Sequence, residues 1–252
     1  MVLFRRIEMQ KISACLVVRN AENVVRGCLE SIKDVVDEII VVDGYSTDKT
    51  ADICQKYTHK IYYRRPKGFP EAERSFAISK AVGEWILIID ADERLSEKLH
   101  DNLRKFTEKS KYVAYAFPRR NYYDVDGKKW TRYVSYPDYQ IRLFKRNKAI
   151  HYGRIHEGPR IIGKIKYVAE PYYIKHLVPN LHSLKKFKTY HMKFVKVHAR
   201  QTQRSKTGAS YILRAPIIFL KLFGRDFLKK KGFLDGITGL KASLMLATYH
   251  LI

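Results

Sequence analysis

The sequence predicts an α/β fold in which a mostly parallel central sheet is covered by helices on both faces. Three observations support this fold class: short continuous apolar runs recur in the first 90 residues, stretches with helical spacing of apolar residues separate them, and two runs end on an aspartate. Alternating strands and helices are typical of parallel sheets that are buried on both faces. Ligands of such sheets bind beyond the carboxyl ends of the strands, so both aspartates are expected to face a crevice.

The predicted elements alternate along the chain. Apolar runs rich in β-branched residues indicate strands, and apolar residues three or four positions apart indicate helices. Strands are expected at 12–18, 38–43, 60–63 and 85–90, with helices at 24–32, between Thr47 and Tyr57, and at 71–82. Ser46 or Thr47 is expected to cap the second helix, because a hydroxyl oxygen accepts a hydrogen bond from a free N–H group of the first turn.

Composition narrows the protein class. The 252 residues are 46 % apolar, which is enough for a real core. No run of 18 or more apolar residues occurs, and the N-terminus lacks the apolar centre and cleavage site of a signal peptide, so we expect a cytoplasmic protein. The three cysteines form neither an even set nor a CxxC pair, which favours reduced core residues.

The chain is strongly basic. With 49 Lys and Arg against 25 Asp and Glu, the net charge of +24 indicates an anionic partner. Residues 181–252 contribute 15 Lys and Arg but only two acids, and apolar blocks alternate there with cationic ones. The longest uncharged apolar run, APIIFL, is too short to span a bilayer. We expect amphipathic helices at an anionic membrane surface, with a homodimer through this segment as the alternative.

Two short stretches limit the classes of enzyme that the sequence fits. The first strand leads into VVRNAEN, which lacks the glycine-rich turns of dinucleotide-binding and P-loop enzymes. The fourth strand ends in IIDADE, where Asp90 and Asp92 form a DxD pair. Two carboxylates so close repel each other unless a cation lies between them, and oxygen ligands suit Mg²⁺ or Mn²⁺. An acidic triplet is usually a solvated turn, but its place after a buried strand, with Asp43 at another strand end, favours a metal site.

These stretches resemble the family 2 glycosyltransferases, inverting enzymes of GT-A fold that use nucleotide-diphospho-sugars. The matching blocks are ISACLVVRNAENVVRGCLESI, DEIIVVDGYSTDKTADIC, GEWILIIDADERLS, YPDYQIRLFKR and RIHEGP, and GFLDGITGL has a counterpart in the similar lipopolysaccharide core glucosyltransferases. The resemblance implies a GT-A catalytic domain and a basic amphipathic helical extension. The expected boundaries are 1–178 for the domain, with a donor half at 11–95 and an acceptor half at 111–178, and 179–252 for the extension.

The resemblance also assigns the donor site. Asp43 would contact the base or ribose of a UDP- or GDP-sugar, and Asp90 its ribose or sugar. Arg74 would contact the phosphates, and Arg142 is also assigned to the donor. Asp92 would ligate the metal that bridges the diphosphate. The alternative for Asp43 is a purely structural role at the start of the turn.

A second group of residues is assigned to metal and catalysis. His156 is a candidate for contact with the metal or diphosphate. Asp138 is the first candidate for the base that takes the proton from the acceptor hydroxyl, and Glu157 is the second. The alternative for Asp138 is a structural ion pair with Arg142 or Arg146.

The sequence therefore predicts a metal-assisted inverting glycosyltransferase that moves a hexose to a hydroxyl of a lipid-linked or cell-surface glycan acceptor at the inner face of the cell membrane. Aromatic and basic residues at 119–137 suit a carbohydrate or phosphate, and no RNP, KH or zinc-knuckle pattern indicates nucleic acid. A sugar-phosphate nucleotidyltransferase is one alternative, although its GxGTR-type loop is missing. A noncatalytic basic protein that binds anionic lipid or nucleic acid is the other, and it leaves the acids at the strand ends unexplained.

Overall fold

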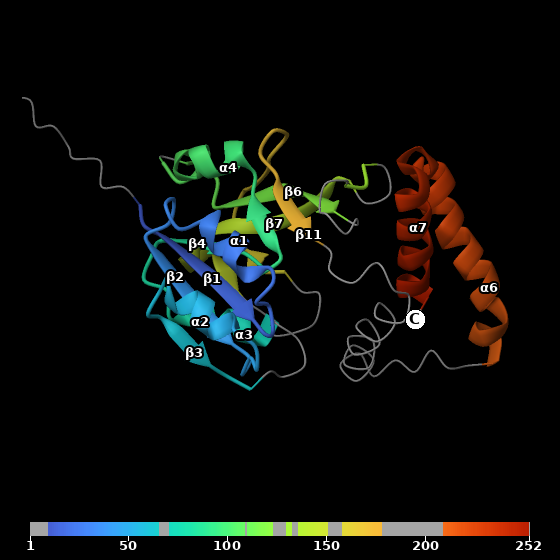
Figure 1. The fold of residues 1–252 in the computed structure, drawn as a ribbon. Coiled ribbons are helices and arrows are strands. Elements are labelled where there is room, and N and C mark those ends of the chain that lie inside the picture. The colour runs from blue at the N-terminus through green and yellow to red at the C-terminus, as the bar shows by residue number, and fades with distance from the viewer. Residues whose placement is uncertain are drawn as a thin grey trace, which may run out of the picture.

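The computed structural model describes residues 10–65, 71–108, 110–122, 130–132, 136–150, 158–177 and 209–251. A nine-stranded sheet with flanking helices occupies residues 10–177, here called the sheet domain, and two long helices follow it (Figure 1). The strand order is β3-β2-β1-β4-β7-β6-β11-β5, with β10 paired to β6. The predicted α/β fold class is therefore confirmed.

The first half of the sheet is parallel. Its strands are β1 (Ile12–Val18), β2 (Glu38–Asp43), β3 (Ile61–Tyr63) and β4 (Trp85–Ile88), connected by α1 (Val25–Glu30), α2 (Thr50–Gln55) and α3 (Glu71–Ser79). The predicted elements are present and shift by a few residues at their ends. β4 ends two residues early because Glu93 N donates a hydrogen bond to Asp90 O at 2.9 Å and turns the chain.

Helices cover both faces of this half. Leu16 and Val41 pack with Val25 and Leu29 of α1 on one face. On the other face, the side chains of Cys15, Ile40, Ile86 and Ile88 pack with Ala77 of α3. Successive strand residues point to opposite faces, and both are apolar here, which explains why these strands read as continuous apolar runs.

The second half of the sheet is mixed. It contains β5 (Glu93–Leu95), β6 (Ala114–Tyr122), β7 (Asp138–Lys145), β10 (Ile165–Tyr167) and β11 (Ile174–Leu177), beside α4 (Glu97–Asn102) and the short helix η1 (Leu103–Phe106). β7 runs antiparallel to both β4 and β6, whereas β11 runs parallel to β6 and antiparallel to β5. After the turn η2 (Arg146–Lys148), β8 (Ala149–Ile150) pairs with β9 (Arg160–Ile161) as a separate ribbon.

The C-terminal segment is helical, as predicted. It consists of α6 (Ala209–Gly224), the π-helical turn η3 (Arg225–Lys229), η4 (Gly232–Asp235) and α7 (Gly236–Leu251). Gly239 allows a close approach of α7 to η4, because a Cβ there would lie 1.9 Å from Gly232 O. No helix within the described residues is long and apolar enough to cross a membrane. The predicted boundary at 178/179 lies outside the described residues.

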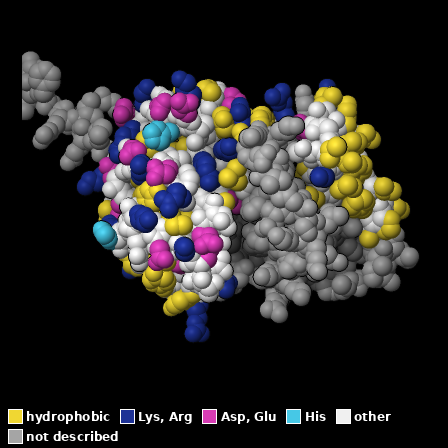
Figure 2. Space-filling model, viewed as in Figure 1, with side chains coloured by type: hydrophobic (Ala, Val, Ile, Leu, Met, Phe, Trp, Pro, Cys, Tyr) yellow, Lys and Arg dark blue, Asp and Glu magenta, His cyan; other side chains and the backbone are white. Residues whose placement is uncertain are grey.

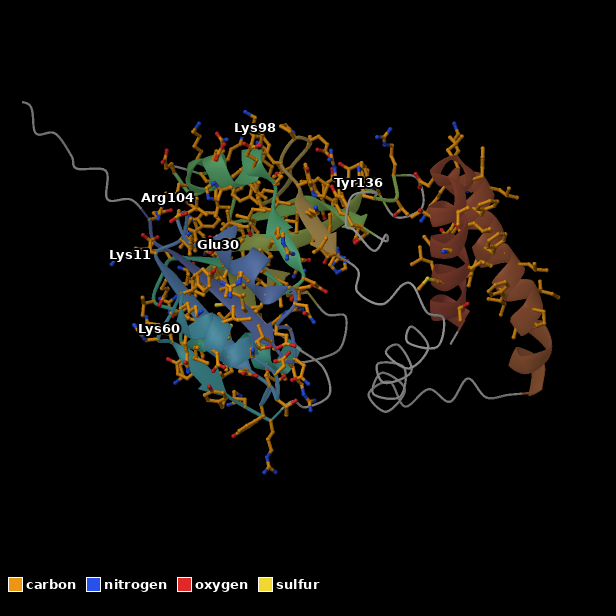
Figure 3. All side chains as sticks on the ribbon, in the orientation of Figure 1. Lys11, Glu30, Lys60, Lys98, Arg104 and Tyr136 are labelled. Carbon is orange, nitrogen blue, oxygen red and sulfur yellow. The ribbon has the colours of Figure 1, made fainter. Side chains whose placement is uncertain are left out.

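The surfaces of the two parts differ. Cations and acids are interspersed on the sheet domain, whereas hydrophobic side chains gather over the C-terminal helices (Figure 2). On the sheet domain, Lys33 Nζ lies 2.9 Å from Glu30 Oε2, and Arg104 Nη1 lies 3.2 Å from Asp37 Oδ2. Glu30 and Arg104 are both on the outside of this domain (Figure 3). The cysteines are buried and free, as predicted, and burial raises the pKa of the Cys54 thiol to about 12.

Candidate active site

Asp43 ends β2 with a fully buried side chain. Its Oδ1 accepts hydrogen bonds from Ser46 N at 2.8 Å and Ser46 Oγ at 2.7 Å. Its Oδ2 is also buried but has no hydrogen-bond partner. An unpaired buried acceptor costs about 1–3 kcal/mol, so this oxygen is a ready acceptor for an N–H or hydroxyl group of a ligand. The carboxylate thus organises the turn with one oxygen and leaves the other available.

The predicted capping of α2 is wrong. The helix begins at Thr50, its N-cap is Lys49, and no side chain caps it. Ser46 bonds to Asp43 instead, and Thr47 N donates to Asn20 Oδ1 at 2.8 Å. Asn20 N in turn donates to Ser46 Oγ at 2.9 Å. These hydroxyl and amide groups therefore tie together the loops that follow β1 and β2, at the carboxyl edge of the sheet.

Asp43 and Asp90 lie at the same edge. β1 separates β2 from β4, and all three strands are parallel. Asp43 is in register with Val18, and Ile88 with Cys15, so Asp90 leaves β4 near the level at which Asp43 leaves β2. Two strand spacings, roughly 10 Å, separate these strand ends. The topology therefore brings the predicted donor-binding carboxylates to one edge of the sheet.

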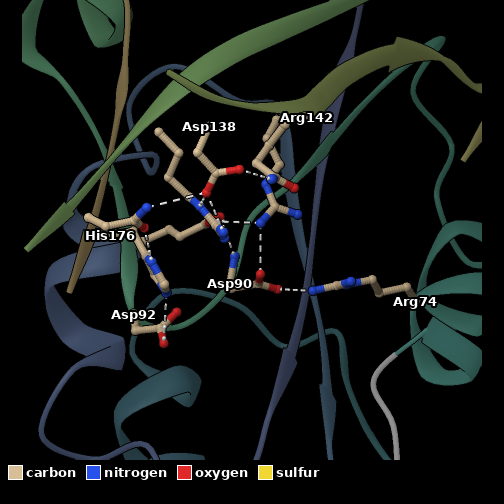
Figure 4. Close-up of polar contacts among 10 residues, drawn as sticks. Arg74, Asp90, Asp92, Asp138, Arg142 and His176 are labelled. Atoms are coloured by element: carbon tan, nitrogen blue, oxygen red, sulfur yellow. Dashed lines mark hydrogen bonds and ion pairs between the residues drawn. The ribbon is translucent and has the colours of Figure 1, made fainter. Parts of the chain in front are cut away.

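Asp90 is held between two arginines (Figure 4). Arg74 from α3 bonds to its Oδ1, and Arg142 Nη2 from β7 lies 2.8 Å from its Oδ2. Burial alone would raise the pKa of Asp90, but Arg74 and Arg142 hold that pKa well below its usual range. Asp90 is consequently ionised at neutral pH.

Arg142 also binds a second carboxylate. Its Nη2 lies 2.6 Å from Oε1 of Glu93, which is fully buried and also lies 3.2 Å from Arg119 Nη1. Burial opposes the charge of Arg142, but Glu93 and Asp90 raise its pKa above the ordinary value. Arg142 is thus buried with its guanidinium paired to two carboxylates, and its ion pair holds Asp90 in place. Glu93 is a member of this site that sequence reasoning missed, although it lies within the quoted DADE stretch.

Asp138 begins β7 and pairs with an arginine that the sequence did not indicate. Arg119 of β6 reaches Asp138 Oδ2 at 2.7 Å, rather than Arg142 or Arg146, and Gln140 Nε2 donates to Oδ1 at 2.7 Å. Burial would raise the pKa of Asp138, but Arg119 and these hydrogen bonds lower it. Asp138 is therefore charged at neutral pH and able to accept a proton.

His176 connects Asp138 to the DxD motif. Asn121 Nδ2 donates to Asp138 Oδ2 at 3.3 Å, which turns Asn121 Oδ1 toward His176 Nδ1 at 2.6 Å. Nδ1 must then carry a proton, and the other ring nitrogen, Nε2, lies 3.5 Å from Asp92 Oδ2 (Figure 4). In the neutral imidazole, Nε2 presents a lone pair toward a carboxylate, so these two atoms are suited to share a cation.

The possible metal ligands at this edge are few. No group of three or more His, Cys, Asp or Glu residues in the described ranges is arranged to hold a metal ion. Asp92 and His176 form a pair, and Mg²⁺ is usually held by one or two protein groups together with waters and substrate phosphates. The pair therefore fits a cation that binds with a diphosphate better than a metal enclosed by protein.

The family model described as Glycosyl transferase family 2 matches residues 13–160 of this chain. The chain belongs to glycosyl transferase family 2. An uncharacterized glycosyltransferase of Rickettsia felis is 38 % identical over 110 residues, which is 42 % of this chain and 38 % of that protein. The SPbeta prophage-derived glycosyltransferase SunS of Bacillus subtilis is 30 % identical over 159 residues, 62 % of this chain. The chain covers only 36 % of SunS, so it spans well under half the length of either relative.

A solved structure supports the family 2 fold. The crystal structure of S. aureus TarS 1-349 superposes with a TM-score of 0.52 at 14 % identity, covering 96 % of this chain and 90 % of that one. At this identity the likeness shows the fold alone, and it confirms the predicted GT-A fold. TarS 1-349 has also been crystallised with UDP and with UDP-GlcNAc.

Two predicted residues of this family 2 site, His156 and Glu157, lie outside the described residues. Part of the predicted acceptor stretch can be placed. The Arg120 guanidinium lies 3.7 Å from the centre of the Tyr173 ring and 4.6 Å from that of Trp130, and it pairs with Glu170 at 2.8 Å. This contact with Tyr173 and Glu170 was not predicted, because both follow the stretch by more than 30 residues. Glu170 and Tyr173 lie in the segment just before β11, the strand that contains His176.

Proposed function

We propose that the protein is an inverting glycosyltransferase that moves a hexose from a nucleotide-diphospho-sugar to an acceptor hydroxyl with the help of a divalent cation. The observation that carries this proposal is a linked set of polar groups at the carboxyl edge of the sheet. Arg74, Asp90 and Arg142 are connected through Glu93 and Arg119 to Asp138, and Asp138 is connected through Asn121 to His176 and Asp92. Together with membership of family 2, this set supplies the groups that such a transfer requires.

Asp43 is proposed to bind the nucleoside. Its unpaired Oδ2 can accept a hydrogen bond from a base N–H or a ribose hydroxyl, while Ser46 fixes its other oxygen. TarS, which shares the fold, binds UDP and UDP-GlcNAc in its crystal structures. A UDP-sugar is therefore the first donor to test, with a GDP-sugar as the alternative. The noncatalytic alternative leaves Asp43 Oδ2 without a partner.

Asp92 and His176 are proposed to hold Mg²⁺ or Mn²⁺ with the donor diphosphate. When bound, the cation stabilises the negative charge that develops on the leaving nucleoside diphosphate. Asp90, fixed between Arg74 and Arg142, is proposed to orient the ribose or sugar next to it. Arg74, in α3, is the cation we propose for the donor phosphates. His156 remains a predicted ligand.

Asp138 is proposed to act as the base. As the acceptor oxygen bonds to the anomeric carbon, the bond from that carbon to the phosphate oxygen breaks on the opposite side, and the acceptor proton passes to the carboxylate. Because Arg119 keeps Asp138 charged, the carboxylate is ready to take this proton at neutral pH. Glu157 is the second candidate.

We propose a lipid-linked or cell-surface glycan as the acceptor, and the similarity to lipopolysaccharide core glucosyltransferases remains a prediction.

A thermal-shift screen of nucleoside diphosphates and their sugars, with and without Mn²⁺, tests this function. We expect one nucleotide to raise Tm in a metal-dependent way, since a ligand at 100 times its Kd adds about 2.7 kcal/mol to the free energy of unfolding. Asp92→Ala should abolish the shift, whereas Asp34→Ala, at an exposed carboxylate far from the edge, should retain it. No shift with any nucleotide, or an unchanged shift in Asp92→Ala, contradicts the proposal.

A further inference from the structure

The C-terminal helices expose large apolar side chains. Ile237 is 73 % exposed, Ile217 68 %, Leu220 65 % and Leu228 63 %. Leu234 in η4 is also more than half exposed. These five residues are called the C-terminal apolar face, and hydrophobic side chains form a broad patch over this part of the molecule in Figure 2. Monomeric proteins rarely leave large contiguous apolar patches in water, so this face requires a partner.

The helix pair does not need this face for its own packing. α7 contacts α6 and η4, and its side chains Ala242, Ser243, Met245 and Ala247 are buried. Along α6 and η3, Phe219, Phe223 and Phe227 stack on one another in a row with ring centres 6.4 and 5.2 Å apart. The internal contacts are therefore made by one set of side chains, and the exposed leucines and isoleucines form a second set.

The surface around this face is positive. Residues 209–251 contain seven Lys and Arg and only two acids. Asp226 is fully buried, where Arg225 and Lys230 neutralise it at 2.8 and 3.1 Å. Asp235 accepts a hydrogen bond from Arg132 N at 3.2 Å. The exposed charges that remain are cations: Arg214, Lys221, Lys229, Lys231 and Lys241.

We propose that the C-terminal apolar face docks the protein on the surface of an anionic lipid bilayer. Helices that combine exposed apolar residues with Lys and Arg lie at the headgroup level, where the apolar side chains leave water and the cations meet lipid phosphates. A second copy of this chain is a poorer occupant, because the exposed cations of the same helices would repel one another and each chain has a net charge of +24. No residue of the face belongs to the candidate active site, so the inference is independent of the proposed function.

Vesicle co-sedimentation of the full chain tests the docking surface. We expect binding to phosphatidylcholine vesicles that contain about 30 % phosphatidylglycerol, weaker binding to pure phosphatidylcholine, and loss of binding at high salt. The double variant Leu220→Asp with Leu228→Asp should bind about tenfold less. Its matched control is Val82→Asp with Ile162→Asp, which changes apolar side chains of 65 % and 55 % exposure on the sheet domain and should bind like the wild type.

A second pair of variants separates the local cations from the total charge. Lys221→Glu with Lys229→Glu should weaken vesicle binding, whereas Lys56→Glu with Lys98→Glu, which changes the net charge equally on the sheet domain, should not. Circular dichroism checks that every variant is folded. Equal binding by the Leu220→Asp, Leu228→Asp variant and the wild type overturns the proposal. A wild-type dimer in sedimentation velocity that the same variant converts to a monomer, without vesicle binding by either, also overturns it.

Discussion

The carboxyl edge of the sheet and the C-terminal helix pair depart from ordinary protein surfaces in opposite ways. At the edge, charged groups are buried together, as in the 2.6 Å contact between Arg142 and the fully buried Glu93. On the helix pair, apolar groups such as Ile237 are exposed. Burying a charge costs several kcal/mol even when it is paired, and exposing a wide apolar patch forgoes burial energy. Neither arrangement is favoured by stability alone, which is why we propose both as places where another molecule binds.

The largest expected effect concerns the buried charges. Arg142→Met leaves the carboxylates of Asp90 and Glu93 without their shared cation, and breaking a buried pair in this way typically costs about 3–5 kcal/mol. Urea unfolding of the purified protein measures this change. Arg146→Met, at an exposed position just after β7, removes only a hydrogen bond to Gly83 O and should cost less than about 1 kcal/mol. If both variants lose a similar free energy of unfolding, the buried ion pairs of Arg142 stabilise the protein no more than an exposed arginine does.

The next effect concerns catalysis. Asp138→Asn removes the proposed base while preserving size, and loss of a general base lowers the rate by about 10²–10⁴-fold. Release of nucleoside diphosphate from the donor, with water as the acceptor, measures the rate, and donor affinity should be unchanged. Asp101→Asn, at an exposed residue of α4, is the control. If Glu157→Gln causes the loss and Asp138→Asn does not, the base is Glu157.

A smaller effect is expected at His176. His176→Ala removes a proposed metal ligand and should raise the Mn²⁺ concentration needed for nucleotide binding by about 10–100-fold. The metal requirement is read from the Tm shift at increasing Mn²⁺. His59→Ala, at an exposed position, should leave the requirement unchanged. A purely structural His176 lowers the Tm of the free protein but leaves the Mn²⁺ requirement as it is in the wild type.

The smallest change concerns pH. The pKa values of Asp90 and Asp138 are lower in the folded protein than in the unfolded chain, where aspartate titrates near 3.9. Their contribution to stability is therefore fully present above about pH 5 and is lost as the pH falls below 4 toward the folded-state values. Urea unfolding between pH 7 and pH 3 should show this loss, and Asp90→Asn should reduce it. A variant with the same pH profile as the wild type contradicts the link to Asp90.

Sequence reasoning found the features that depend on residues adjacent in the sequence. The strands at 12–18 and 38–43 were predicted at their observed bounds because each is a continuous apolar run, and Asp43 was recognised because it ends one of them. The predicted capping of α2 was wrong because the helix begins only at Thr50, and the Ser46 hydroxyl instead donates to Asp43 and accepts from Asn20 N. Hydrogen bonds of Ser46 to Asp43 and Asn20 therefore replace the expected hydrogen bond to the helix.

The contacts of the site that sequence reasoning missed join distant segments of the chain. Arg119 and Asn121 on β6 and His176 on β11 join the site only because the strand order places β7, β6 and β11 next to one another. No spacing in the chain links Asn121 to a histidine 55 positions later. Glu93 lies beside the DxD motif, but its role depends on Arg142 from β7. Such partners require the topology of the sheet to be known first.

The most direct measurement is a crystal structure with Mn²⁺ and the nucleoside diphosphate selected by the thermal-shift screen, with the metal located by its anomalous signal. We expect the manganese ion within ligand distance, about 2.0–2.2 Å, of Asp92 and the diphosphate, and a base or ribose group hydrogen-bonded to Asp43 Oδ2. A nucleotide bound away from the carboxyl edge, or bound there with Asp43 and Asp92 both uninvolved, contradicts the central claim.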